Sequence, residues 1–285
     1  MQPLHFNLIG AGRLGKNLAL SLSSAGHLLK AIFNKQVITA NQACSTLNSG
    51  KAVAYLSDLP QADIIFITTP DDVIEEIVLE LASKKIIKPG SIAVHCSGVL
   101  NSDILKPLQA QGCFIASLHP LKAFRADTLD KNSFNNCDCA LEGDNQATQV
   151  LSMLFKPLGA NLVTIMPDKK PLYHAAAVFA SNYLVTLALQ ALHLFKEVGI
   201  KEQEAKPIIA RLMHTSLANI QDAANLSTAL TGPLARGDVN TIVKHLKAQK
   251  YLSTLPLYKA LSVETLPLTS LSLLQKKLLA ELLRE

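Results

Sequence analysis

Three glycines near the N-terminus constrain the fold of this chain more than any other feature. Gly10, Gly12 and Gly15 form a G-x-G-x-x-G pattern between the apolar run 4–9 and an amphipathic run over 13–25. In a strand–turn–helix, these glycines permit a tight turn, leave room for a pyrophosphate and let the helix pack closely on the strand. The N–H groups at the positive end of the helix then bind the phosphates. The pattern therefore predicts a dinucleotide site made by Gly10, Ala11, Gly12, Arg13, Leu14 and Gly15.

The first half of the chain alternates short apolar runs with helical patterns, which is typical of a sheet covered by helices on both faces. Strands are predicted at 4–9, 28–33, 52–56, 63–69, 91–95, 114–118, 139–141 and 161–165, and helices at 13–25, 73–81 and 146–155. From Asp168 onward the pattern is one helix after another. We expect an α/β fold: a Rossmann-type, doubly wound parallel sheet over 1–166, followed by an all-α substrate and dimerisation domain over 167–285.

The composition excludes several classes of protein. With 49% hydrophobic and 17% charged residues in 285, the chain can build a sizeable core, which rules out disorder, collagen and coiled coil. Its net charge of +5 is scattered, which favours a small anionic substrate and argues against a nucleic-acid partner. Five irregularly spaced cysteines predict neither a disulfide framework nor a metal site. With no signal peptide ahead of the first strand, we expect a reduced, cytoplasmic protein.

One stretch is long enough to raise the question of a membrane. The 25 residues between Lys170 and Lys196 carry no formal charge. Their polar side chains, His174, Ser181, Asn182, Thr186, Gln190 and His193, fall within roughly half of a helix circumference. We expect a buried helix of a protein without a membrane span, with one polar side that faces a site.

The end of the second strand distinguishes the two nicotinamide cofactors. An NAD site usually has Asp or Glu there, whereas this strand ends in Phe33, Asn34 and Lys35. Asn34 can donate to a 2′-phosphate and Lys35 can pair with it, helped by Arg13, so NADP is preferred. Lys35 could equally be a solvated surface lysine. Thr69 ends the strand predicted at 63–69 and Pro70 follows it, and both are expected to contact the cofactor.

Five further strings resemble a known family. They are HCSG at 95–98, SLHPLKAF at 117–124, YHAAA at 173–177, SN at 181–182 and LTGPLARGD at 230–238. The set resembles the Rossmann-like proteins that carry the DUF2520 domain. Those are relatives of 6-phosphogluconate dehydrogenases, pyrroline-5-carboxylate reductases and F420-dependent NADP oxidoreductases. The resemblance implies an NADP-linked reductase with a helical dimerising domain, and some such proteins look like alternative ketopantoate reductases.

Reduction of a keto acid requires a positioned nicotinamide, a cation for the carboxylate and an acid for the developing alkoxide. Because related reductases place a proton donor and an amide on the long helix, the resemblance implies His174 as donor and Asn182 as orienting residue. Candidate cations are Lys122, where the family usually has a polar residue such as Gln, and Arg236. The remaining candidates are Ser97 for the cofactor and His119, Ser181 and Asp238 for the substrate. The alternatives are structural: a buried, backbone-bonded His174, a His119 that fixes a strand end, and an Arg236–Asp238 ion pair.

These residues lead to three hypotheses about function. The first is an NADPH-dependent reductase of a small 2-oxo acid, with ketopantoate as the best single guess. The second is an imine or pyrroline-carboxylate reductase, whose cationic substrate does not need His174 as a donor. The third is a non-catalytic NADP-binding sensor or scaffold. In each case we expect a homodimer formed through the helical domain.

Overall fold

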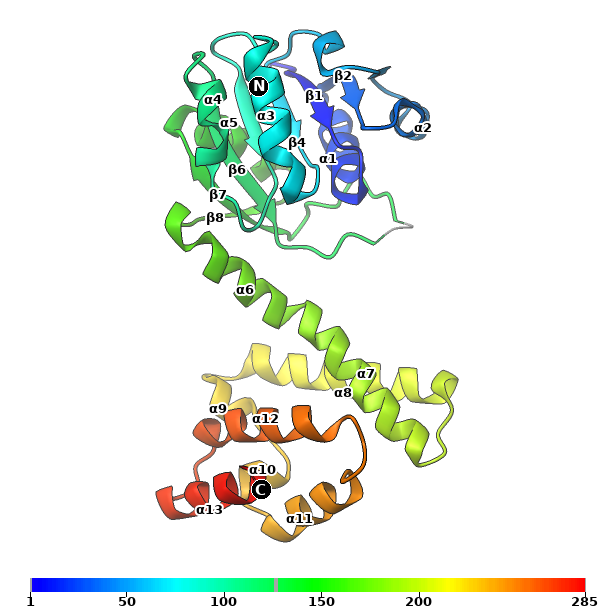
Figure 1. The fold of residues 1–285 in the computed structure, drawn as a ribbon, viewed down its shortest axis with the longest axis vertical. Coiled ribbons are helices and arrows are strands. Elements are labelled where there is room, and N and C mark those ends of the chain that lie inside the picture. Colours follow the sequence, from blue (N-terminus) through cyan, green and yellow to red (C-terminus); the bar gives the residue numbers. More distant parts are fainter. Residues whose placement is uncertain (1, 126–127, 285) are drawn as a thin grey trace. The chain divides into compact units, whose positions relative to one another are not determined.

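The computed structural model describes residues 2–125 and 128–284, and within them an eight-stranded sheet (Figure 1). The strand order is β3-β2-β1-β4-β5-β6-β7-β8. The strands are β1 (His5–Ile9), β2 (Leu28–Phe33), β3 (Lys51–Val53), β4 (Ile64–Ile67), β5 (Ile92–His95), β6 (Phe114–Pro120), β7 (Asp138–Gly143) and β8 (Asn161–Thr164). Each predicted strand is therefore present, and the predicted α/β fold class is confirmed.

Neighbouring strands run parallel everywhere in this sheet except between β6 and β7. The expectation of a parallel sheet fails at that pair, which is antiparallel. Parallel neighbours require a crossover connection, usually a helix, whereas the described part of this connection, 121–125 and 128–137, contains no helix. The antiparallel register sets Ser117 of β6 directly opposite Glu142 of β7.

Helices cover both faces of the sheet. On one face, α1 (Arg13–Ser24), α2 (Val37–Leu47) and α5 (Asn145–Phe155) pack against Phe6, Leu8 and Phe66. On the other face, α3 (Ile74–Ser83) and α4 (Lys106–Gln109) pack against Ile9 and Ile65. Successive residues of a strand point to opposite faces, so β4 is apolar throughout, and β1 is apolar at each buried position except Asn7. The sheet is doubly wound, as predicted.

The chain forms two compact units, Met1–Ser181 and Asn182–Glu285, each of which we describe by itself. The first unit includes α6 (Lys170–Ala180), which lies beyond the domain boundary expected at 166. The second contains α7 (Asn182–Glu197), α8 (Glu202–Asp222), α9 (Leu226–Ala229), α10 (Pro233–Arg236), α11 (Val239–Ala248), α12 (Leu255–Thr265) and α13 (Leu273–Arg284). The described part of this unit is all-helical. Its buried apolar clusters are small: Leu192, Ala205 and Ile209 in one, and Ile242, Leu266, Leu279 and Leu283 in the other.

The long apolar stretch differs from its prediction in two ways. Ser181 has non-helical dihedral angles (φ −123°, ψ −65°), so α6 and α7 are separate helices rather than one. The inference that His174 and Asn182 share a face rested on one uninterrupted helix, and it is lost with the break. In addition, only 6% of the most apolar window in Pro167–Glu197 is buried. By length and composition this segment passes the test for a membrane span, and the helix expected to be buried is exposed in the single chain.

Candidate functional site

The three glycines of the N-terminal loop differ in their surroundings. Gly10 has φ +93°, a left-handed conformation that favours glycine, and a Cβ there would lie 2.9 Å from the backbone nitrogen of Thr69. A Cβ on Gly15 would lie 2.2 Å from the carbonyl oxygen of Gly10, so this position holds the helix close to the strand. A Cβ on Gly12 would meet nothing within 4 Å. The turn, the close packing and the open space are the three features that a pyrophosphate-binding loop requires.

A groove of about 680 Å³ begins at this loop and runs over the ends of β2 and β4. Its lining includes seven of the residues predicted to bind the cofactor: Gly10, Ala11, Gly12, Asn34, Lys35, Thr69 and Pro70. Leu56, Val73 and Ile77 supply apolar walls. The buried Thr69 hydroxyl has no hydrogen-bond partner in the structure. Room for a dinucleotide, apolar walls for a base and a hydroxyl without a partner together fit a nicotinamide dinucleotide.

The residues that were predicted to select NADP are placed unequally. Asn34 already holds the loop, because its Oδ1 accepts from the Ala11 N–H at 2.7 Å and its Nδ2 donates to Thr39 Oγ1 at 2.9 Å. Lys35 is exposed at the rim of the groove, and Arg13 is exposed at the first position of α1. Lys35 and Arg13 are thus the cations that can reach a phosphate beside the groove.

A second group of polar side chains gathers around Gly98, which follows β5. Nδ1 of His119, near the end of β6, lies 2.8 Å from the hydroxyl of Tyr173 on α6. The His119 and His174 rings meet edge to face, with centroids 5.7 Å apart. A Cβ on Gly98 would lie 2.3 Å from Cδ2 of His174 and 2.9 Å from Nε2 of His119. The two imidazoles therefore come together only because residue 98 lacks a side chain.

Burial keeps His95 and His119 neutral. Desolvation, with smaller effects of His174 and Lys170, lowers the pKa of His119 to about 4. The pKa of His95, in β5, is lowered to about 3 by burial and by Lys170. Its Nδ1 accepts from the Ser97 N–H at 3.2 Å, so the ring proton sits on Nε2, which donates to the Asn101 carbonyl at 3.0 Å. At neutral pH His95 and His119 therefore act as hydrogen-bonding groups and not as cations.

A buried ion pair lies beside these rings, and our sequence reasoning did not find it. Lys170 is 1% exposed; its Nζ donates to Ser117 Oγ and lies 3.4 Å from Oε1 of Glu142. Glu142 also accepts from the N–H of Ser102 at 2.8 Å and from its hydroxyl at 2.6 Å. The available signal was an acid inside the otherwise apolar run CALEG, since a buried carboxylate needs a partner. The sequence did not indicate which cation would supply it.

The other predicted site residues are held by local contacts. The Ser97 hydroxyl accepts from the N–H groups of Val99 and Leu100 at 3.1 and 3.0 Å. These two bonds shape the turn that contains Gly98. Lys122 donates its Nζ to the Ser133 carbonyl at 2.6 Å. In the helical unit, Arg236 Nε and Nη2 lie 3.0 and 2.8 Å from Oδ2 of Asp238. Ser181 and Asn182 are exposed and flank the boundary between the two units.

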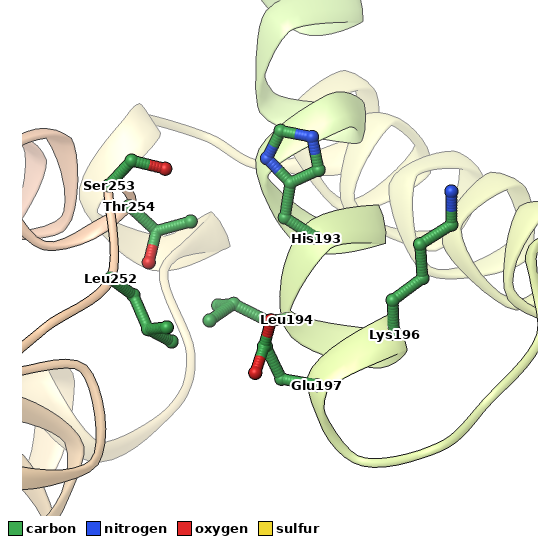
Figure 2. Close-up of a pocket in the computed structure, with 7 residues that line it drawn as sticks. All are labelled: His193, Leu194, Lys196, Glu197, Leu252, Ser253 and Thr254. Atoms are coloured by element: carbon green, nitrogen blue, oxygen red, sulfur yellow. The ribbon is translucent and has the colours of Figure 1, made fainter.

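A smaller pocket of about 290 Å³ lies in the helical unit, between the end of α7 and residues 252–254 (Figure 2). Two of its polar lining residues are paired within the unit: Lys196 pairs with Glu202 at 2.6 Å, and Thr254 donates to Gln249 at 2.9 Å. The part of the chain that the structure describes contains no cluster of three or more side chains suited to a metal ion. The groove and the histidine group of the first unit therefore form the candidate site.

The fold and the groove are those of the Rossmann-type, dinucleotide-binding class of protein. Residues 2–120 match the family model of the Rossmann-like domain, and residues 137–265 match that of the domain of unknown function DUF2520. The chain belongs to the family of proteins that join these two domains, as the sequence strings predicted. A search of curated protein sequences found no significant match.

Solved structures support the same fold over nearly the whole chain. A protein from Bacteroides fragilis described as an NADP oxidoreductase is 19% identical with a TM-score of 0.78, and the match covers 93% of this chain and 98% of that one. A protein from Thermotoga maritima is 24% identical with a TM-score of 0.70, covering 98% and 100%. Pyrroline carboxylate reductase from Plasmodium falciparum, solved with NADP bound, is 12% identical with a TM-score of 0.60, covering 95% and 100%.

Proposed function

We propose that this protein is an NADPH-dependent oxidoreductase that reduces a small 2-oxo acid. One observation carries the proposal: the cofactor groove and the histidine group lie at the same edge of the sheet. Thr69, Gly98 and His119 follow or end β4, β5 and β6, which are adjacent strands. In open α/β sheets, ligands bind outside the carboxyl ends of the strands.

Different residues around the groove would bind different parts of the cofactor. The N–H groups of Gly12 and Arg13 lie at the positive end of α1 and would bind the pyrophosphate, for which the open space beside Gly12 leaves room. Lys35 and Arg13 would pair with the 2′-phosphate, and Thr69 and Pro70 would line the path toward the nicotinamide. Ser97, which shapes the turn after β5, would lie near the nicotinamide ring. When bound, NADPH supplies the hydride, and the protein orients the substrate and moves a proton.

His174 is the proposed proton donor to the substrate's carbonyl oxygen. It is half-buried beside His119, whose neutral ring can hold a substrate oxygen by a hydrogen bond without competing for the proton. Within the first unit, Ser181 would orient the substrate, and Lys122 is the candidate cation for its carboxylate. Ketopantoate is the substrate that we propose to test first.

Purified protein, NADPH and a panel of 2-oxo acids that includes ketopantoate test this function by loss of reduced-cofactor absorbance. We expect turnover with at least one member and a decrease of about 100-fold in the variant His174→Ala. Absence of oxidation across the panel would contradict the proposal. If NADPH nevertheless raised the melting temperature, the protein would be a cofactor-binding sensor or scaffold.

An imine reductase is the second candidate, favoured by the structural likeness to pyrroline-carboxylate reductases. Its substrate is already cationic and requires no proton donor. The discriminating result is therefore a His174→Ala variant that keeps its turnover on a cyclic imine such as pyrroline-5-carboxylate.

We also propose that the helical unit forms a homodimer. Large apolar side chains of α8 are exposed in the single chain: Leu212 by 60%, Leu217 by 46% and Ile220 by 49%. Together with the apolar, exposed Pro167–Glu197 segment, this is more apolar surface than a monomer usually leaves in water. Light scattering on detergent-free protein should give twice the chain mass. Recovery of the protein only in the membrane fraction would instead favour a lipid-facing segment.

A further inference from the structure

The buried Lys170 lies within one helical turn of the proposed proton donor. Lys170 begins α6, and Tyr173 and His174 follow at i+3 and i+4, so all three side chains project from one side of the helix. Ser117 and His119 are two residues apart in β6 and therefore share a face of the sheet. The structure joins these two faces twice, once from Lys170 to Ser117 and once from Tyr173 to His119.

The two contacts together fix the rotation of α6 about its axis, which a single contact would not do. A single contact between His119 and Tyr173 would leave α6 free to turn about that point. The second contact, one turn earlier, sets the rotation of the helix about its own axis. A rotation by one residue position, about 100°, would carry His174 away from Gly98.

The partners of Lys170 are themselves fixed from separate parts of the fold. Glu142 comes from β7, the strand whose antiparallel register places it opposite Ser117. Its carboxylate is held by the N–H and the hydroxyl of Ser102. A buried ion pair contributes little to net stability but defines which arrangement of its elements is allowed, because any other leaves a charge unpaired.

The ammonium also places a positive charge near His119 and lowers the pKa of that ring. The titratable groups that face His119 are His95 from β5 and Lys170, Tyr173 and His174 from α6. Burial raises the pKa of Tyr173, so its hydroxyl keeps its proton. Burial also lowers the pKa of Lys170, an effect opposed by Glu142, whose carboxylate favours the charged ammonium.

We propose that Lys170 is a positioning residue: its ammonium, held by Ser117 and Glu142, sets the rotation of α6 and keeps a positive charge beside His119. His174 and Tyr173 are thereby placed over Gly98, and protonation of His119 is disfavoured. The consequence for catalysis rests on the function proposed above. The placement of α6 and the charge of the Lys170 ammonium do not depend on that function.

The test compares three variants of the full chain. Lys170→Met/Glu142→Gln removes both charges together, so that no buried charge is left unpaired, and Lys170→Arg keeps the cation. Lys169→Met is the matched control, because Lys169 is the adjacent lysine, more than half exposed, and pairs only with Asp168 in the described structure, at 3.3 Å. Circular dichroism and melting curves verify that each variant is folded.

The principal readout is an NMR titration of the histidine rings without cofactor or substrate. In the wild type, His119 should titrate near pH 4. In the double variant we expect its midpoint to rise by less than about one pH unit, because Lys170 has the smallest of the three effects that lower the pKa of His119, after burial and His174. The midpoint should stay low in Lys170→Arg and in Lys169→Met. A folded double variant with the wild-type midpoint would overturn the proposal, as would a raised midpoint in Lys170→Arg or an equal shift in Lys169→Met.

Kinetics separate this inference from the proposed function. If a 2-oxo acid is reduced, the double variant should lose about tenfold or more in kcat while its Kd for NADPH stays within about twofold. The titration requires no turnover, so it decides the inference even if no substrate is found. Turnover combined with an unchanged titration would overturn the inference and leave the reductase function intact.

Discussion

The hydroxyl of Tyr173 lies 2.8 Å from Nδ1 of His119, which joins the first turn of α6 to the end of β6. Because Nδ1 is engaged in this way, Nε2 of His119 faces Gly98 and His174. The contact gives the two imidazoles fixed orientations before any substrate arrives. Four predictions follow from this arrangement and from the groove beside it.

Gly98→Ala should separate the two histidines. The added Cβ would lie 2.3 Å from Cδ2 of His174, and at least one ring must move. Since Gly98 has no left-handed backbone conformation, the effect is steric only. We expect a loss of about 1–3 kcal/mol in the free energy of unfolding and a decrease of about 100-fold in kcat. Steady-state kinetics and urea unfolding measure both, and Val99→Ala, at an exposed neighbour, serves as the control. A variant as active as the wild type would show that the ring contact is dispensable.

The second and third glycines of the loop should respond differently to alanine. At Gly12 the Cβ enters open space, so we expect stability within about 0.5 kcal/mol of wild type and NADPH binding weakened by about tenfold or more. At Gly15 the Cβ would meet the Gly10 carbonyl at 2.2 Å, so we expect a loss of about 1–3 kcal/mol in stability as well. Melting curves with and without NADPH distinguish the two variants. Equal destabilisation by both would contradict the assigned roles.

Lys35→Glu should change the cofactor preference. The side chain is exposed at the rim of the groove, and a carboxylate there would repel a 2′-phosphate but not a ribose hydroxyl. We expect NADPH to bind about tenfold or more weakly, a cost of about 1.4 kcal/mol or more, with NADH little affected. Fluorescence titration at two salt concentrations measures both affinities. Lys30→Glu, at an exposed position of β2, should change neither, and a parallel loss for the two cofactors would mean that Lys35 does not contact the phosphate.

His95 should make the protein less stable in acid. Its pKa is about 3 in the folded state against 6.5 for an unperturbed histidine, so between these values the unfolded chain binds more protons. The stability contributed by the neutral ring is therefore complete above about pH 6.5 and is lost as the pH falls, by up to about 1.4 kcal/mol per pH unit. Urea unfolding at pH 5 and pH 7 measures this dependence. His95→Gln should reduce the slope, and an unchanged slope in the folded variant would refute the assignment.

The sequence predicted the local elements well because their signals are local. The strand at 28–33 has the predicted ends, and the glycine loop has the turn, the space and the close packing that its spacing requires. Helix ends were less accurate: the predicted single helix across Ser181 is two helices, because apolar periodicity continues through a residue whose backbone leaves the helix.

Buried polar partners were the hardest feature to predict. Lys122 and Arg236 were selected as cations from their motifs, yet they bond to Ser133 and Asp238. Lys170, which was not selected, is the buried one. Its contacts reach residues 28 and 53 positions away in the chain, a distance at which no periodicity connects them.

The sequence by itself determined the dinucleotide loop and the alternation of strands and helices, because glycine spacing and apolar periodicity act on the backbone within a few residues. Tertiary structure alone decided which charges are buried together and which rings meet. Those pairings depend on the antiparallel register of β6 and β7 and on the point at which α6 begins, and both are set by packing among segments far apart in the chain.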